Sequence, residues 1–368
     1  MTLRITGVSF RDFRSYEAFE LRNVGMLSIL VGPNAVGKTN VIEGIQLLTA
    51  LTSFRHATIE QLIRHGRSAA SLSADVSDGN RQLDVGLRME GHVKRYQLNG
   101  KAKKPAELKG LVPSVTFTPD DLDLVKGSMS GRRQAVDSLG SQLNANYYLI
   151  LKDYEKVIRH KNKLLKEEAS LLLIDSIDEM LITCGAQLTC YRAALFEKLA
   201  PYMKQRYEQI AGTRERFEAW FAPSWESIDE KNPQRFDVSR ETSRERLAAA
   251  LKEHRGEEVQ RRRALVGPHV DQLVFTIDGL NATHYGSQGQ QRSVVLAYKL
   301  AEAAVIEEML DQKPILLLDD VMSELDGERR EALVDYISDD VQTFITTANL
   351  AYFDRDMLSS ADVVNLPL

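Results

Sequence analysis

The sequence has few cysteines and no long apolar run. Cys184 and Cys190 are the two cysteines among 368 residues. No matching set of cysteines or histidines lies near them, so a disulfide framework or a zinc site is excluded. No stretch approaches the roughly 18 apolar residues of a membrane-spanning helix, and the N-terminal segment lacks the apolar core of a signal peptide. We therefore expect a soluble cytoplasmic protein with reduced core thiols and no membrane partner.

The chain also lacks a net positive charge. It has 47 Lys and Arg against 52 Asp and Glu, a formal charge of −5, so nucleic-acid binding requires a local basic patch. Residues 131–166 offer one, with eight basic and three acidic residues. A second basic tip lies at residues 101–104. A solvated helix face explains the first segment equally well. The candidate DNA contacts are Lys152, Lys156, Arg159 and Lys163.

One glycine-containing segment has a phosphate-binding pattern. Residues 32–39 read GPNAVGKT, between an apolar run at 26–31 typical of a buried strand and a helical pattern at 41–51. Backbone N–H groups of such a loop face phosphate oxygens, Lys38 reaches the β- and γ-phosphates, and the Thr39 hydroxyl binds Mg²⁺. The alternative is a glycine turn with a surface lysine. The predicted ATP-binding residues are Gly32, Pro33, Asn34, Ala35, Val36, Gly37, Lys38 and Thr39.

A second segment supplies carboxylates. Residues 315–318 are apolar, which fits a central parallel strand, and Asp319 and Asp320 follow. Asp319 can hold Mg²⁺ directly or through water, and Asp320 can orient or deprotonate the attacking water. Many ATPases of this architecture have glutamate at the second position, so the shorter aspartate predicts slow hydrolysis. With Lys38 these residues form the predicted catalytic set; the alternative is a strand-end turn with two solvated carboxylates.

A third segment indicates a second copy of the chain. Residues 287–291 read SQGQQ and open a helical pattern at 292–310. A serine at a helix start presents a hydroxyl and free N–H groups to an anion. Because Lys38 already marks one phosphate site, we interpret this segment as facing the γ-phosphate held by another subunit, although an ordinary capping serine is the alternative. The residues of this signature are Ser287, Gln288, Gly289 and Gln290.

The middle of the chain has helical periodicity. Apolar residues, Met180 among them, recur at steps of three and four over 143–164 and 177–199. Pro201 is expected to break or restart the second helix. The seam lasts only a few heptads, which excludes a long coiled coil. These segments predict a compact antiparallel helical lobe, and a charged helix at 243–265 that returns the chain to an α/β core.

The order of these segments resembles the ABC-type ATPase heads of SMC-like proteins: phosphate loop, SQGQ signature, LLLDD strand and SELD loop. Further stretches resemble the RecF family. The resemblance implies an α/β fold with two parts. Residues 1–128 and 262–368 form an ABC-type P-loop ATPase head with a β-rich subdomain. Residues 129–261 form an inserted helical lobe. The stretches are FRDFRSY at 10–16, TSFR at 52–55, VTFTPDDL at 115–122, VKG at 125–127, RR at 132–133, GPH at 267–269 and YGSQGQQRS at 285–293.

The resemblance also implies a function. RecF-type proteins are weak, DNA-dependent ATPases that use ATP and Mg²⁺, close as ATP-joined homodimers on DNA, and help load RecA together with RecO and RecR. By resemblance, Arg14 would approach the nucleotide phosphates; a surface arginine is the alternative. The loop expected to meet the partner's site, or simply to cap a helix, consists of Ser323, Glu324, Leu325 and Asp326.

Two departures from related patterns matter. Residues 270–272 are Val-Asp-Gln where the family has Arg-Asp-Asp, which argues against a charge role for this loop. Thr346 and Thr347 stand where transporter ATPases place a histidine. The competing functions are the motor subunit of a membrane transporter and another SMC-like ATPase. The absent histidine and the basic helical lobe argue against a transporter motor.

Overall fold

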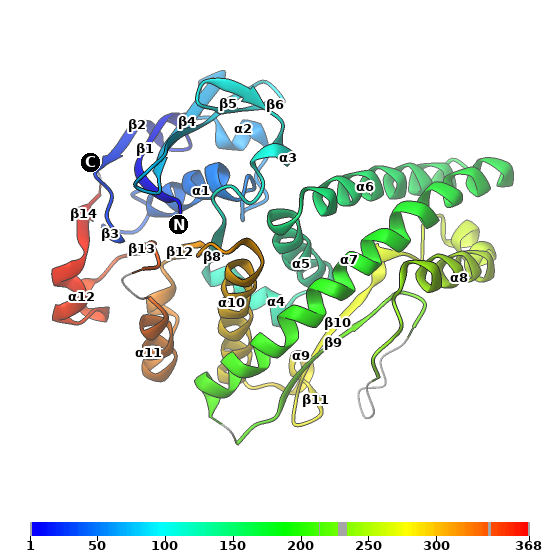
Figure 1. Cartoon of the computed structure of the whole chain (residues 1–368). Coiled ribbons are helices and arrows are strands. Elements are labelled where there is room, and N and C mark those ends of the chain that lie inside the picture. Colours follow the sequence, from blue (N-terminus) through cyan, green and yellow to red (C-terminus); the bar gives the residue numbers. More distant parts are fainter. Residues whose placement is uncertain (1, 213, 227–233, 338–339, 367–368) are drawn as a thin grey trace. The chain divides into compact units, whose positions relative to one another are not determined.

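The computed structural model describes residues 2–212, 214–226, 234–337 and 340–366. The chain divides into two compact units, Met1–Asp121 with Glu302–Leu368, and Leu122–Ala301. The second unit therefore includes residues 262–301, which the sequence grouped with the ATPase head. In Figure 1 the first unit is blue to cyan and orange to red, and the second is green to yellow.

The first unit contains a five-stranded sheet with the order β14-β3-β13-β12-β8, in which all neighbours are parallel. β12 and β13 are buried along their whole length, as the apolar sequence of central strands predicts. The carboxyl ends of β3, β13 and β12 meet at one edge and bring their loops together. The strands are β3 (Leu27–Val31), β8 (Ser114–Phe117), β12 (Ile315–Asp319), β13 (Thr343–Thr347) and β14 (Asp362–Asn365).

A six-stranded antiparallel sheet completes this unit, in the order β2-β1-β4-β5-β6-β7. Helix α1 (Lys38–Thr49) contacts strands of both sheets and lies between them in Figure 1. Nearly all its residues are buried, because a helix between two sheets has no solvent face. Asn99 and Gly100 form the hairpin turn between β6 and β7, with positive φ angles of 51° and 71°. The strands are β1 (Arg4–Phe13), β2 (Tyr16–Arg22), β4 (Ala69–Ser77), β5 (Gln82–Glu90), β6 (Val93–Leu98) and β7 (Lys101–Lys103).

Short helices complete the first unit. They are α2 (Ile59–Leu62), α3 (Pro105–Leu108), α11 (Gly327–Tyr336) and α12 (Arg355–Ser360).

The second unit is built on an antiparallel helix pair, α6 (Ala145–Lys166) and α7 (Leu171–Ala211) (Figure 1). α7 also packs against α8 (Arg240–Arg261). The prediction that Pro201 interrupts the helix is wrong, since α7 runs through it. Leu199 and Met203 on either side are fully buried, and this packing outweighs the lost backbone hydrogen bond. Met180, assigned to the seam, is 57% exposed.

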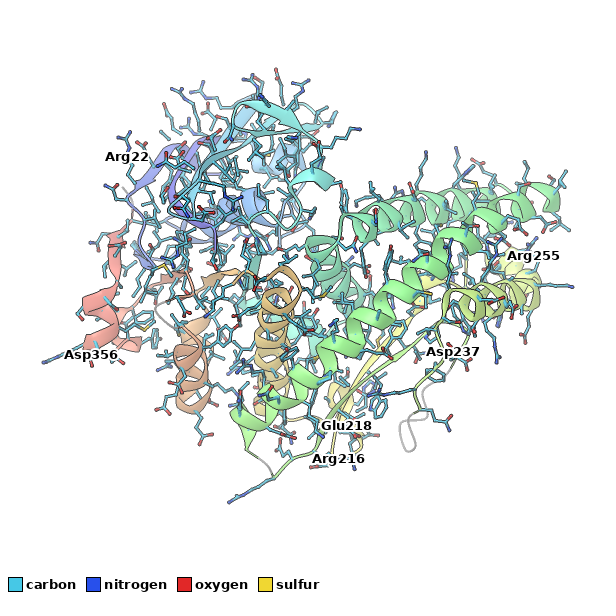
Figure 2. The ribbon with its side chains drawn as sticks, in the orientation of Figure 1. Arg22, Arg216, Glu218, Asp237, Arg255 and Asp356 are labelled. Atoms are coloured by element: carbon cyan, nitrogen blue, oxygen red, sulfur yellow. The ribbon has the colours of Figure 1, made fainter. Side chains whose placement is uncertain are left out.

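This unit is not purely helical. β9 (Phe217–Ala222), β10 (Gln272–Ile277) and β11 (Leu280–Asn281) form an antiparallel sheet, and α7 packs on β9. Arg216 and Glu218, labelled in Figure 2, form an ion pair at the start of β9. The sequence patterns described above do not predict β9. The other helices are α4 (Asp123–Lys126), α5 (Met129–Leu143), α9 (Ala282–Tyr285) and α10 (Gln288–Leu310), whose last residues belong to the first unit.

Buried ion pairs join the helices of the second unit. Lys161 is fully buried and contacts Glu258 at 2.6 Å and Asp178 at 2.9 Å. Arg192 is likewise buried and pairs with Asp137 at 2.7 Å and Asp271 at 3.0 Å. Removing one partner of a buried pair typically costs about 3–5 kcal/mol. The argument against a charge role for residues 270–272 is therefore wrong, because Asp271 carries one inside the core.

Candidate nucleotide site and signature

The phosphate loop follows β3 directly. Its first residue, Gly32, donates its N–H to the Thr347 carbonyl of β13 at 3.3 Å. Lys38 Nζ donates to the carbonyls of Gly32 (2.6 Å) and Pro33 (2.9 Å), so the ammonium lies inside the curve of the loop. Gly37 has a φ of 107°, and a Cβ there would lie 2.8 Å from the Tyr16 hydroxyl. The loop conformation therefore requires glycine at this position.

Asp319 lies at the end of β12 with its carboxylate buried. Thr346 Oγ1 donates to Asp319 Oδ1 at 2.8 Å, and the Thr39 hydroxyl also bonds to this carboxylate. Burial raises the pKa of Asp319, while these two hydroxyls and the charge of Arg55 oppose the rise. A hydroxyl beside a carboxylate is the oxygen donor set that Mg²⁺ uses beside a nucleotide. Thr39 and Asp319 therefore fit the predicted metal role.

Asp320 turns out of the strand toward the phosphate loop. Its φ is 53°, and its N–H donates to Thr346 O at 3.1 Å and to Thr346 Oγ1 at 3.0 Å. Burial raises the pKa of the half-buried carboxyl, and the charge of Lys38 acts in the opposite direction. The Asp320 carboxylate therefore lies within electrostatic range of the Lys38 ammonium.

Arg14 reaches the helix that follows the phosphate loop. Its guanidinium donates to both carboxylate oxygens of Glu43, at 2.8 and 2.7 Å, and to the Gln61 carbonyl at 2.9 Å. Arg14 is therefore a fixed group, not a loose surface arginine. Its neighbour Ser15 accepts a hydrogen bond from Asn40 Nδ2 at 2.9 Å, which ties the β1–β2 turn to the first turn of α1.

The signature lies at the start of α10, in the second unit. Ser287 Oγ accepts the Gln290 N–H at 3.2 Å, and Gln290 Oε1 accepts the Ser287 N–H at 2.8 Å, which forms a reciprocal cap. Ser287 and Gln288 are exposed. Gln290 Nε2 donates to Glu215 at 2.9 Å, and Glu215 accepts the Tyr207 hydroxyl. The signature therefore has a preformed conformation and an open surface.

Arg132 lies in the core of the second unit. It is 1% exposed, and the sequence counted it among the basic residues of the candidate DNA face. Its guanidinium donates to the carbonyls of Leu124, Val125 and Leu273 at 2.7–2.8 Å and to the Thr283 hydroxyl. Arg132, like Lys161, is a core residue and not available to DNA.

The SELD loop connects β12 to α11. Ser323, Glu324 and Asp326 are exposed, whereas Leu325 is 8% exposed. Ser323 Oγ donates to the Asp320 carbonyl at 2.8 Å, and Asp326 accepts the Arg329 N–H at 3.1 Å as the N-cap of α11. Asp326 therefore caps α11, and the exposed side chains of Ser323, Glu324 and Asp326 are accessible to a partner.

The candidate DNA contacts share one face of α6. The spacing of four, three and four residues aligns them along the helix, opposite the buried Tyr154 and Val157. Glu155 and Glu167 pair with three of them, at 2.8–3.9 Å, which partly neutralises the stripe. The basic stripe consists of the exposed residues Lys152, Lys156, Arg159 and Lys163.

Comparison with known proteins identifies the family. Residues 4–364 match the family model described as "RecF/RecN/SMC N terminal domain". The DNA replication and repair protein RecF of Lactobacillus johnsonii is 33% identical over 98% of this chain and 97% of its own length. The chain belongs to the RecF family. The RecF of Nostoc punctiforme is 35% identical over 97% of this chain and 96% of its own.

A solved structure supports the RecF fold. It is described as "Structure of the recombination mediator protein RecF-ATPrS in RecFOR pathway", with a TM-score of 0.86, 28% identity, and coverage of 96% of this chain and 94% of that one. The predicted α/β class, the SMC-like ATPase head and the RecF resemblance are confirmed. Among the described residues, no helix is both long and apolar enough to cross a bilayer.

Two charged residues beside the candidate site are absent from the residues predicted from the sequence, Glu43 and Arg55. Glu43 is fully buried in α1 and receives Arg14, and Arg55 lies within electrostatic range of Asp319. A signal for Glu43 was present, because it is an acidic residue inside an otherwise apolar helical pattern. Arg55 lies in a loop and has no periodic signal, although it belongs to the family-like stretch TSFR at 52–55.

Proposed function

We propose that this RecF-family chain is a cytoplasmic, ATP-dependent DNA clamp in recombinational repair and replication-fork restart. Two copies close over ATP on DNA and, with RecO and RecR, help load RecA. The observation that carries the proposal is the presence of two complementary half-sites on one chain. One is the cluster around Lys38 and Asp319, and the other is the exposed, preformed helix start at Ser287.

The first half-site binds ATP and positions water. Lys38 exchanges its bonds to loop carbonyls for bonds to the β- and γ-phosphates, and Thr39 and Asp319 hold Mg²⁺. When bound, Mg²⁺ neutralises part of the negative charge of the phosphates. Asp320 orients or deprotonates the attacking water. Turnover is slow because the aspartate side chain is shorter than the usual glutamate.

The second half-site completes the first one on another copy. In a two-fold dimer each signature meets the phosphates of the partner, so both sites form together or not at all. The exposed residues of the SELD loop border the same interface. ATP bound at the Lys38 half-site holds the two copies together, and ATP hydrolysis allows them to separate.

The basic stripe on α6 gives the dimer its DNA affinity. A monomer offers one stripe on a chain of net charge −5. Dimerisation brings a second stripe to the same DNA, which raises its effective concentration near the first. DNA binding should therefore require ATP, fall steeply with salt, and depend little on base sequence.

Sedimentation tests the proposal. The chain should sediment as a monomer alone, as a dimer with ATP and Mg²⁺, and as a larger complex when duplex DNA is added. A chain that stays monomeric with saturating ATP would contradict the clamp.

Lys38→Ala should lower ATP affinity by roughly 100-fold, because a charge-assisted contact to the phosphates is lost. Isothermal titration calorimetry measures the ATP affinity of the variant. Lys38→Arg should bind ATP yet turn over poorly, since a planar fork does not replace a point charge. Normal ATP binding by Lys38→Ala would rule out residues 32–39 as the phosphate site.

Lys156→Glu with Arg159→Glu should weaken ATP-dependent DNA binding while ATP-driven dimerisation is retained. Each lost phosphate contact should reduce the log–log salt slope by about 0.9 on duplex DNA. Titration of duplex DNA at several salt concentrations measures both quantities. The charge-matched control is Lys101→Glu with Lys104→Glu at the second basic tip. If the control loses DNA binding and the α6 variant does not, the tip is the DNA surface.

A further inference from the structure

A carboxylate from outside the signature holds the first turn of the signature helix. Glu215 lies in the segment between α7 and β9, 75 residues before Gln290 in the sequence. Its Oε1 accepts a hydrogen bond from Gln290 Nε2 at 2.9 Å, and its Oε2 accepts one from the Tyr207 hydroxyl. One carboxylate therefore joins the C-terminal part of α7 to the first turn of α10.

This contact determines which way round the Gln290 amide lies. A carboxylate only accepts hydrogen bonds, so Glu215 selects the NH₂ end of the amide. The amide oxygen is thereby directed to the Ser287 N–H, which it accepts at 2.8 Å. If the amide turned round, its NH₂ group would face the Ser287 N–H, and two donors would oppose each other. Glu215 thus fixes the acceptor that holds the backbone of Ser287.

The Ser287 hydroxyl depends on the same arrangement. Its oxygen accepts the Gln290 N–H at 3.2 Å, so the cap uses the hydroxyl as an acceptor. The O–H itself remains a donor, and Ser287 is exposed. An outward O–H donor at a helix start is suited to a phosphate oxygen. The direction of this donor follows from the cap, and the cap follows from the Gln290 amide.

Glu215 is itself anchored in the core of the second unit. The Tyr207 side chain is 0% exposed, and its ring stacks on Phe217 of β9 with a centroid separation of 4.9 Å and an angle of 19° between the planes. Phe217 is also fully buried. Because this aromatic pair is packed in the core, the hydroxyl that holds Glu215 has a fixed position.

We propose that Glu215 is a positioning residue for the signature: it orients the Gln290 amide so that Ser287 presents its hydroxyl to the γ-phosphate of ATP held by a second copy. The inference rests on the proposed composite site and adds a residue that acts through Gln290 and not by touching ATP. The negative charge of Glu215 would by itself oppose an approaching phosphate. The hydrogen bond, and not the charge, therefore explains a carboxylate at this place.

Two substitutions separate the hydrogen bond from the charge. Glu215→Ala and Glu215→Gln both remove the charge, but glutamine keeps an acceptor oxygen for Gln290, and the Tyr207 hydroxyl can turn to accept its NH₂ group. Glu215→Ala should weaken ATP-driven dimerisation about 10-fold at each composite site, and so about 100-fold in the dimerisation constant. Glu215→Gln should stay within about threefold of the wild-type constant. Sedimentation with ATP and Mg²⁺ measures both constants.

A measurement on the nucleotide-free chain reports the positioning directly. Hydrogen exchange of the Ser287 N–H, followed by NMR, should be about 10-fold faster in Glu215→Ala and close to the wild-type rate in Glu215→Gln. The matched control is Glu218→Ala (Figure 2), which removes a nearby carboxylate that pairs with Arg216. This control should change neither the exchange of the Ser287 N–H nor dimerisation.

Three results would overturn the inference. Wild-type dimerisation and Ser287 exchange in Glu215→Ala would show that Glu215 does not position the signature. Equal losses in Glu215→Ala and Glu215→Gln would assign the effect to charge, and a similar loss in Glu218→Ala would assign it to general damage near β9. A wild-type chain that stays monomeric with ATP would contradict the proposed function instead, and the exchange of the Ser287 N–H would still test the role of Glu215.

Discussion

Arginine in place of Ser287 is expected to abolish ATP-driven dimerisation and to leave ATP binding by each chain intact. The exposed Ser287 hydroxyl caps α10, and the longer side chain both removes this cap and fills the space in front of the helix start. A two-fold dimer contains the change twice. A loss of about 2–3 kcal/mol per site thus becomes about 4–6 kcal/mol, on the order of 10³–10⁴ in the dimerisation constant. Sedimentation in the presence of ATP measures the dimerisation constant.

Ser239→Arg is the matched control. Ser239 caps α8, where its Oγ accepts the Thr242 N–H at 3.3 Å, so the change removes a similar cap away from the signature. This variant should dimerise with ATP like the wild-type chain. If Ser239→Arg also fails to dimerise, loss of a helix cap explains both results. Dimerisation of Ser287→Arg at wild-type ATP concentrations would refute the shared site.

Asp320→Asn should keep ATP bound and slow its cleavage by on the order of 10²–10⁴-fold, the usual cost of removing a general base. Burial raises the pKa of this carboxyl against the charge of Lys38, which makes it a stronger base than a solvated aspartate. Asparagine has nearly the same shape and no base function. ATP turnover under single-cycle conditions measures the rate, and the dimer should persist longer after ATP is added.

Asp356→Asn controls for the loss of one negative charge. Asp356 is an exposed residue of α12 in the same unit (Figure 2), so Asp356→Asn should leave ATP turnover unchanged. If turnover by Asp320→Asn also stays at the wild-type rate, another residue positions the water.

The nucleotide half-site was predictable because its signals are local. A phosphate loop is read from consecutive residues, and an apolar run followed by Asp319 and Asp320 predicts a central strand with carboxylates at its end. The parallel order β3-β13-β12 then brings the two segments together. The assignment of ATP, Mg²⁺ and partner roles to individual residues stays a prediction that the proposed variants test.

The rest of the structure depends on contacts between distant residues, which leave no local pattern. Arg132 and Lys161 contribute to the positive charge of segment 131–166, yet each is buried and finds acceptors from segments up to 151 and 97 residues away. Pro201 was treated as a helix breaker because its effect on backbone hydrogen bonding is local. Packing of α7 against β9 and its helical neighbours decides the outcome, and that packing appears only in the folded chain.

The length of α7 has a mechanical consequence. At about 1.5 Å per residue, its 41 residues form a rod of about 60 Å. Its N-terminal part packs against α6, which carries the basic stripe, and near its other end Tyr207 holds Glu215, which holds Gln290 of the signature. If DNA binds the basic stripe, a force on α6 would reach the signature through one stiff helix and two hydrogen bonds. Pro201 has no backbone N–H and therefore lacks one helical hydrogen bond, so α7 would bend first at this residue.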